Sequence, residues 1–246
     1  MNSISKLPVE NIFDEFVKEV GGELVRELMP RGVDIPKNAD YLFCKEPLVA
    51  ELKCLEKDIF KDKTYQRKLD RLYESWVNQG LIPPLRSSED TVRLPPKCSE
   101  QYINLGRRPL EGRIRQADKQ IKETKAYFGL KEAYGLLFIA NDGNYSFEND
   151  AIRYLVGQIL QMRGDSSSID AFVYFTVNMK AKIAGDDTKW LVWLPSYRSK
   201  ENDTISEFVN LLGNKWAHFY AHKIGEKIID AQPEDESIVD KMRFIK

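Results

Sequence analysis

Several features that mark common protein classes are scarce in this sequence of 246 residues. The three cysteines, Cys44, Cys54 and Cys98, form an odd number without C-x-x-C spacing, which argues against disulfides and a structural zinc site. No apolar run approaches the roughly 20 residues that a membrane-spanning helix needs, so we expect no membrane partner. The first residues, MNSISKLPVENIF, contain no apolar h-region, so we expect no secretory signal and a reducing, cytoplasmic location.

Motifs of several enzyme classes are also missing. The sequence contains no glycine-rich phosphate loop and no serine in a nucleophile elbow. The two histidines, His218 and His222, have metal-ligand spacing in HFYAH, but this segment lacks the glutamate of a metalloprotease. We therefore interpret both histidines as packing or surface residues.

The sequence has almost no excess of charge of either sign, because its formal net charge is −1. The distribution is nevertheless uneven: residues 61–125 contain fifteen Lys/Arg and nine Asp/Glu, whereas the C-terminal segment DAQPEDESIVD is acidic. A basic segment is typical of a nucleic-acid partner, although such a segment can also be a merely solvated surface.

The apolar periodicity predicts an alternation of helices and strands. Helices are expected at 9–29, 61–79, 113–128, 148–162 and 205–229, and strands at 39–44, 48–55, 135–140, 171–177 and 190–194. Residues 80–110 carry five prolines and are expected to be irregular, with a short strand near 91–94. Strands separated by helices indicate a mixed α/β sheet covered on both faces. We predict a single domain with a core at 9–56 and 111–195, an insertion at 57–110 and a C-terminal helical segment at 203–230.

Two charged residues interrupt a strand that otherwise looks buried. In LVAELKCL, Glu51 and Lys53 are two positions apart and therefore share one face of the strand. A hairpin turn centred on Lys45 and Glu46 would place Asp40 opposite Glu51, with Cβ atoms roughly 5 Å apart. Two carboxylates and an ammonium group would then converge on one patch of the sheet.

The chemistry of these three groups is coherent. Two neighbouring carboxylates repel each other unless a cation or a proton lies between them. One or two carboxylates, with water and phosphate as the remaining ligands, form the environment that Mg²⁺ selects. A lysine beside them can hold an attacking water and balance the anionic transition state of phosphodiester cleavage.

The pattern Asp-x10-Glu-x-Lys, on adjacent strands after an N-terminal helix, resembles the PD-(D/E)xK nuclease superfamily. The matching residues are "AD" at 39–40 and "ELK" at 51–53, and Ala39 replaces the proline that often precedes the aspartate. The family order of helix, strand hairpin, strand, helix and strand fits residues 9–140. The resemblance implies a restriction-endonuclease-like α/β fold and a metal-dependent DNA endonuclease of a restriction, defence or recombination system.

The resemblance also implies roles for the residues of the motif. Asp40, Glu51 and the backbone carbonyl of Leu52 would bind Mg²⁺ or Mn²⁺. Lys53 would position or activate the attacking water. The alternative without a functional site is an exposed edge strand, on which Glu51 and Lys53 form a surface ion pair and Asp40 belongs to a turn.

Supporting residues are expected from two helices. Many members of the family add an acid from the first helix, and Glu23 and Glu27 lie at or near its apolar face. The helix RIRQADKQIKETKAYF resembles the one that presents a polar residue to the site, and Gln120, which flanks its apolar stripe, is preferred to Gln116. Solvated surface positions are the alternative for all four side chains.

The partners of the chain follow from its charge and from the resemblance. Arg107, Arg108, Arg113 and Arg115 are expected to contact phosphates, and family frequency favours DNA over RNA. A different hypothesis is a non-catalytic subunit that keeps this fold for nucleic-acid binding or assembly. The amphipathic helix at 205–229 would then serve a homodimer or a protein partner.

Overall fold

The computed structural model describes residues 6–30, 38–85, 92–145, 149–183, 188–199, 203–227 and 242–245. The helices are α1 (Val9–Glu19), α2 (Val25–Leu28), α3 (Lys63–Asn78), α4 (Pro96–Tyr127), α5 (Asn149–Arg163) and α6 (Asp203–Ile224). The strands are β1 (Glu23–Leu24), β2 (Tyr41–Phe43), β3 (Leu48–Leu55), β4 (Tyr134–Asn141), β5 (Ala171–Thr176), β6 (Lys180–Ile183), β7 (Trp193–Tyr197) and β8 (Met242–Ile245). No helix among these residues is long and apolar enough to cross a membrane.

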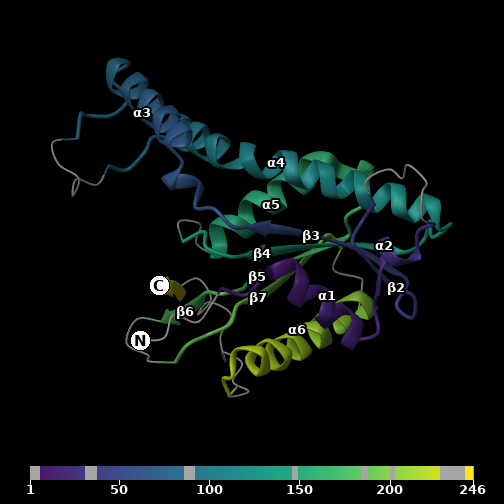
Figure 1. The fold of residues 1–246 in the computed structure, drawn as a ribbon. Helices are drawn as coiled ribbons and strands as arrows, with labels where there is room; N and C mark the ends of the chain where they lie inside the picture. The colour runs from purple at the N-terminus through teal and green to yellow at the C-terminus, as the bar shows by residue number, and fades with distance from the viewer. Residues whose placement is uncertain are drawn as a thin grey trace.

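A six-stranded mixed sheet forms the centre of the molecule, in the order β1-β2-β3-β4-β5-β7. Strands β3, β4 and β5 are parallel, whereas β2 and β7 run antiparallel to their neighbours. Helices α1 and α6 cover one face of the sheet, and α4 and α5 cover the other (Figure 1). The prediction of a mixed α/β sheet covered on both faces is confirmed. The pair β6–β8 is a separate two-stranded sheet that the periodicity did not predict.

Each face of the sheet has its own hydrophobic core. The core under α1 and α6 is rich in aromatic rings, with Phe13 in contact with Phe138, Phe175 and Trp216. The core under α4 and α5 is mostly aliphatic. The apolar face predicted for the helix at 205–229 packs into the aromatic core as α6, so this face serves the core and not a partner. A homodimer or protein partner of this helix stays a prediction.

The predicted helix at 9–29 is wrong in its second half. Helix α1 ends at Glu19, and Gly21 takes a left-handed backbone conformation with φ +88°. Gly22 follows in a tight contact, because a Cβ there would lie 2.6 Å from both the Phe43 ring and the Val17 side chain. The chain therefore turns into β1 and the short helix α2, which changes the direction of every side chain after Gly22.

The predicted irregular structure at 80–110 is also wrong for its last part. Helix α4 begins at Pro96 and continues for 32 residues, with Pro109 inside it. Proline at the first helical position loses no hydrogen bond, and buried Leu105 and Leu110 stabilise the helix on either side of Pro109. Residues 92–94 form no strand, and Thr91 lies outside the described residues.

The remaining differences are smaller. The last strand of the large sheet was expected at 190–194 but is β7, three residues later, and Trp190 forms an isolated bridge with Ala181. The other predicted helices and strands of the second half are present within a few residues of their expected bounds. Helix α6 ends before Gly225, which has φ +70°.

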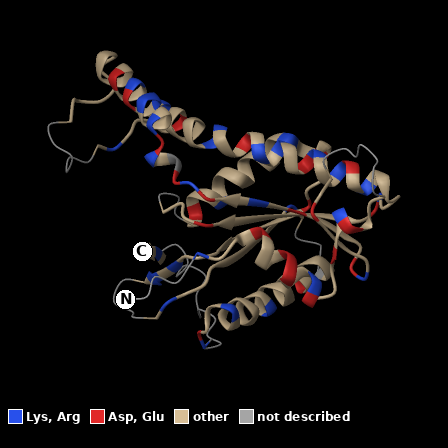
Figure 2. Ribbon diagram, in the orientation of Figure 1, with Lys and Arg blue, Asp and Glu red and all other residues tan. Residues whose placement is uncertain are grey.

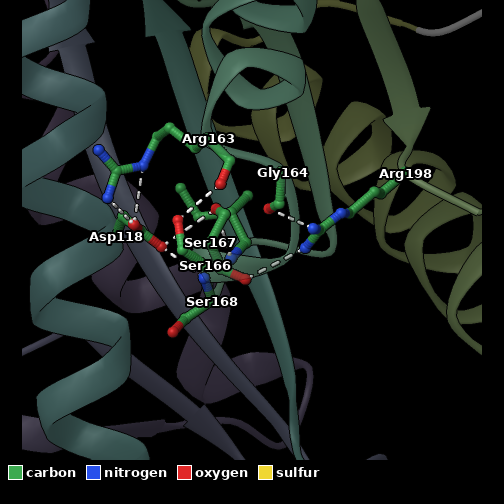
Figure 3. Close-up of polar contacts among 8 residues, drawn as sticks. Asp118, Arg163, Gly164, Ser166, Ser167, Ser168 and Arg198 are labelled. Atoms are coloured by element: carbon green, nitrogen blue, oxygen red, sulfur yellow. Dashed lines mark hydrogen bonds and ion pairs between the residues drawn. The ribbon is translucent and has the colours of Figure 1, made fainter.

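A buried ion pair fastens α4 to the connection between α5 and β5 (Figure 3). Asp118, which is 3% exposed, accepts hydrogen bonds from the Arg163 guanidinium, the Ser167 hydroxyl (3.1 Å) and the Ser168 N–H (2.6 Å). Arg198, beyond β7, donates to the backbone carbonyl of Ser167 (3.1 Å). These contacts fix the position of α4 along the sheet.

Candidate functional site

The hairpin of β2 and β3 has the register that the sequence predicted. Tyr41 pairs with Ala50 and Leu42 pairs with Val49, so continuing the ladder by one residue places Asp40 opposite Glu51. Tyr41 and Ala50 face the core under α1, whereas Leu42 and Val49 face the core under α4. Side chains alternate along a strand, so Asp40, Glu51 and Lys53 all lie on the α4 face.

Beyond Ala50, the edge of β3 that pairs with β2 has no neighbouring strand in the described part of the chain, because β2 begins at Tyr41. The Asp40 carboxylate accepts a hydrogen bond from the Leu52 N–H (Oδ2 to N, 2.8 Å) and so takes the place of the missing strand. The N–H and C=O of one residue in a strand point toward the same edge, so the Leu52 carbonyl also faces this opening. The Leu52 carbonyl and the Asp40 carboxylate therefore lie along the same edge of β3, and the Glu51 carboxyl lies beside Asp40 on the α4 face.

Glu51 is the most buried member of the group, with 1% of its surface exposed. Burial and the negative charge of Asp40 together raise its pKa to about 8, although the Lys53 ammonium acts in the opposite direction. Lys53 Nζ donates a hydrogen bond to Glu51 Oε1. Among the residues that the structure describes, the second oxygen, Oε2, is buried without a hydrogen-bond partner.

Asp40 has a related environment. Burial raises the pKa of this carboxyl, while the hydrogen bond from Leu52 and the charge of Lys53 lower it. Two buried carboxyl groups with raised pKa values lie beside one another, so a cation between them would relieve both the burial cost and the repulsion.

Gln120 on α4 completes the polar group, as the sequence predicted. Its Oε1 accepts a hydrogen bond from Lys53 Nζ (3.1 Å), and its Nε2 donates to the Asn38 carbonyl (2.8 Å). Gln116 is exposed on another side of α4. The amide holds the lysine and also ties α4 to the backbone that leads into Asp40.

The alternative without a functional site, in which Glu51 and Lys53 lie on an exposed edge strand, is wrong. Strand β3 lies between β2 and β4, and all but two of its eight residues are buried. The Lys53 side chain is 19% exposed, so this end of the polar group reaches the surface while Glu51 does not.

The two acids expected from the first helix are not at the site. Glu23 is exposed in β1 and accepts a hydrogen bond from Cys44, and Glu27 is exposed in α2 and pairs with Lys18. The physical reason is the chain reversal at the glycine pair, which moves both side chains away from α1. The α1 acid whose charge acts on Asp40 is Glu10, in the first turn of the helix. Ending the predicted helix at the glycine pair would have left Glu10 among the candidates.

The four predicted phosphate-binding arginines do not lie together. Arg113 donates a hydrogen bond to the Cys54 carbonyl at the end of β3. It precedes Gln120 by seven residues, which is nearly two helical turns, so both side chains lie on the side of α4 that faces the site. Arg107 is half-buried against Met162 of α5. Arg108 and Arg115 are exposed about half a turn around the helix from buried Ala117, on the outer side. Figure 2 shows Lys and Arg along much of α3 and α4.

Comparison with protein-family models, with curated proteins and with solved structures gives no match to this chain. The functional argument therefore depends on the geometry of the site.

The donor set of the site fits a hard divalent cation better than zinc. No group of three or more His, Cys, Asp or Glu side chains suited to a metal ion occurs in the described part of the chain. Two carboxylates and a backbone carbonyl are oxygen donors, and Mg²⁺ is usually held by one or two carboxylates while water and phosphate fill its other positions. Glu51 Oε2 has no donor among the described residues, and it lies beside the Asp40 carboxyl, so a cation bound between the two groups would satisfy both.

Proposed function

We propose that this protein is a metal-dependent nuclease that hydrolyses phosphodiester bonds in DNA, with a restriction-endonuclease-like fold. The observation that supports the proposal is the convergence of Asp40, Glu51, Lys53 and Gln120 on the open edge of one strand, with a buried Glu51 oxygen to which no described residue donates a hydrogen bond. Without a metal, a proton on Glu51 that is hydrogen-bonded to Asp40 relieves the repulsion between the two groups, and a cation between the two carboxylates would take the place of that proton.

The side chains divide the work. Asp40, Glu51 and the Leu52 carbonyl would hold Mg²⁺ or Mn²⁺, and the bound cation would neutralise phosphate charge and make water more acidic. Lys53 would position the attacking water and stabilise the charge that develops on the phosphate oxygens. Gln120 touches Lys53 and the backbone before Asp40, so it would keep the ammonium aimed at the reacting phosphate.

The order of elements also supports the proposal. The resemblance implies a helix, three strands, a helix and a strand, and the chain has α1, the strands β1, β2 and β3, helix α4 and strand β4 in this order, with β4 next to β3 in the sheet. Helices α2 and α3 are additions to that order. The role that the resemblance gives to an acid of the first helix passes from Glu23 and Glu27 to Glu10. The residue is proposed to influence the site through its charge on Asp40.

A cleavage assay tests the proposed function. Purified protein is incubated with supercoiled plasmid, single-stranded DNA and RNA in Mg²⁺, Mn²⁺, Ca²⁺ or a chelator. Cleavage is expected with Mg²⁺ or Mn²⁺. Asp40→Asn should abolish cleavage by weakening metal affinity, with partial recovery at raised Mn²⁺, whereas the exposed control Asp150→Asn should cleave as the wild type does. Wild-type rates for Asp40→Asn would contradict the assignment, and wild-type protein inactive on all three substrates would favour a non-catalytic binding or assembly module.

A further inference from the structure

A helical arm extends from the sheet beside the candidate site. Helix α3 packs on the N-terminal half of α4, and the two helices project beyond the layers that cover the sheet (Figure 1). The arm has a small hydrophobic cluster of its own, centred on Trp76, Ile82 and Cys98. The indole of Trp76 also donates to the Gln101 side chain (2.6 Å). The arm is therefore a packed element with fixed geometry.

The arm begins on the same side of α4 as the site. Gly106, Arg113 and Gln120 follow each other at intervals of seven residues, which is close to two helical turns, so they form one line along the helix. Gln120 contacts Lys53, and Arg113 contacts the end of β3. A Cβ at Gly106 would lie 3.8 Å from the hydroxyl of Tyr65, in the first turn of α3. The line thus runs from the site to the start of α3.

The exposed surface of α3 is basic. Four exposed cations, Lys63, Arg67, Lys68 and Arg71, lie on this helix, against the two exposed acids Asp70 and Glu74. Three of the cations recur at intervals of four residues and form a stripe along the helix. Figure 2 shows this concentration of Lys and Arg on α3.

The distance between the arm and the site can be measured along α4. The Tyr65 side chain meets α4 at Gly106, which is 14 residues before Gln120. The Trp76 side chain meets α4 at Gln101, which is 19 residues before Gln120. At 1.5 Å per residue these two contacts are about 21 and 28 Å from the site. The spacing of phosphates along one DNA strand, about 3.4 Å, makes this about six to eight base pairs.

The arm suits a duplex better than a single strand. Single strands are usually held by exposed aromatic side chains on which the bases stack. In the described part of the arm, Tyr65 and Trp76 are buried, and the hydroxyl of half-buried Tyr73 accepts a hydrogen bond from the Leu85 N–H. Tyr102 of α4 is exposed, at 37%, but one exposed ring beside Phe60 is not the row of rings that successive bases need. A row of cations fixed on packed helices instead matches the regularly spaced phosphates of a duplex.

We propose that α3 is a duplex-DNA docking arm that holds the phosphate backbone about six to eight base pairs to one side of the bond at the site. This inference rests on the proposed function for the identity of the site, but the arm's binding is measured without cleavage. Contacts from Lys63, Arg67 and Arg71 give affinity and position, and they carry no sequence information by themselves.

The test is the salt dependence of binding to a 24-base-pair duplex, measured by fluorescence anisotropy in a chelator so that no metal is present. Each phosphate contact contributes about −0.9 to the slope of log affinity against log salt. The triple variant Lys63→Gln/Arg67→Gln/Arg71→Gln should therefore reduce the magnitude of the slope by about 3 and weaken binding. A control with the same charge change elsewhere, Lys131→Gln/Lys189→Gln/Lys215→Gln, should keep the wild-type slope; these three lysines are exposed and lie outside the arm.

A conservative variant guards against misfolding, since Arg67→Lys/Arg71→Lys keeps the charges and should keep the slope. Equal slopes for the triple variant and the control would overturn the inference, as would an equal loss on single-stranded DNA or wild-type protein that binds no duplex. Duplex binding through the arm without any cleavage would keep this inference and contradict the proposed nuclease. Cleavage by the wild type, together with an unchanged salt slope in the triple variant, would support the proposed nuclease and contradict the docking arm.

Discussion

Replacing Glu51 with glutamine separates a metal-binding carboxylate from a structural ion pair. The amide has nearly the same size as the carboxyl and no charge. Burial and Asp40 raise the pKa of Glu51 to about 8, so near neutral pH the metal-free side chain is largely protonated and resembles glutamine in charge. We therefore expect Glu51→Gln to fold, and to be at least as stable as the wild type at pH 8 without metal.

The pH dependence of stability gives this expectation a magnitude. The unfolded chain releases the Glu51 proton near pH 4.5, whereas the folded chain keeps it until about pH 8. The stabilisation from this group is therefore fully present below pH 4.5 and is lost as the pH rises toward 8, by up to about 1.4 kcal/mol per pH unit. The total loss over this window is on the order of 5 kcal/mol, and Glu51→Gln should not show it.

Metal binding should reverse the loss in the wild type alone. A cation that binds the folded chain at a hundred times its Kd stabilises it by about 2.7 kcal/mol. Urea unfolding at pH 5, 7 and 8.5, with and without Mg²⁺, measures both effects, and the exposed control Glu111→Gln should behave as the wild type. The same pH dependence and the same Mg²⁺ effect in Glu51→Gln and the wild type would refute the reasoning.

Two further substitutions test the position of α4 and its arginines. Asp118→Ala removes a buried carboxylate from Arg163 and should cost about 3–5 kcal/mol in the free energy of unfolding. Asp165→Ala removes a fully exposed carboxylate from Arg198 and should cost less than about 1 kcal/mol. Equal costs would contradict the structural role of the buried carboxylate. Arg113→Gln should weaken DNA binding and reduce the salt slope by about 1, whereas Arg115→Gln, on the outer side of the helix, should have a smaller effect; the opposite order would place the DNA on the outer side.

The hairpin and its three charged residues were predictable because the contacts that define them are local. The turn fixes the register of two adjacent strands, and alternation then assigns Asp40, Glu51 and Lys53 to one face. Gln120 lies 67 residues from Lys53, yet the apolar stripe of its helix defines the direction in which it points. Sequence periodicity predicted the direction of a polar side chain wherever the apolar residues beside it define the buried face of the helix or strand.

The errors occurred where distant contacts decide the local structure. Five prolines suggested irregular chain at 80–110, but the packing of α3 on Cys98 and Gln101 makes helix from Pro96 onward. The pairing of β6 with β8 joins segments about 60 residues apart and leaves little trace in either sequence. The prediction that Glu23 or Glu27 faces the site was wrong because a single left-handed glycine, Gly21, follows α1 and reverses the chain.

The most direct test of the nuclease assignment is the cleavage rate of purified Lys53→Ala protein. Lys53 is proposed to act on the attacking water and on developing charge, so its removal should abolish cleavage while folding and most DNA binding remain. Raised Mn²⁺ should not restore the activity, because the missing group is not a metal ligand. If Lys53 served only as the partner of Glu51, the loss would change stability and leave the rate unaltered. Full metal-dependent cleavage by Lys53→Ala would contradict the assignment of this site.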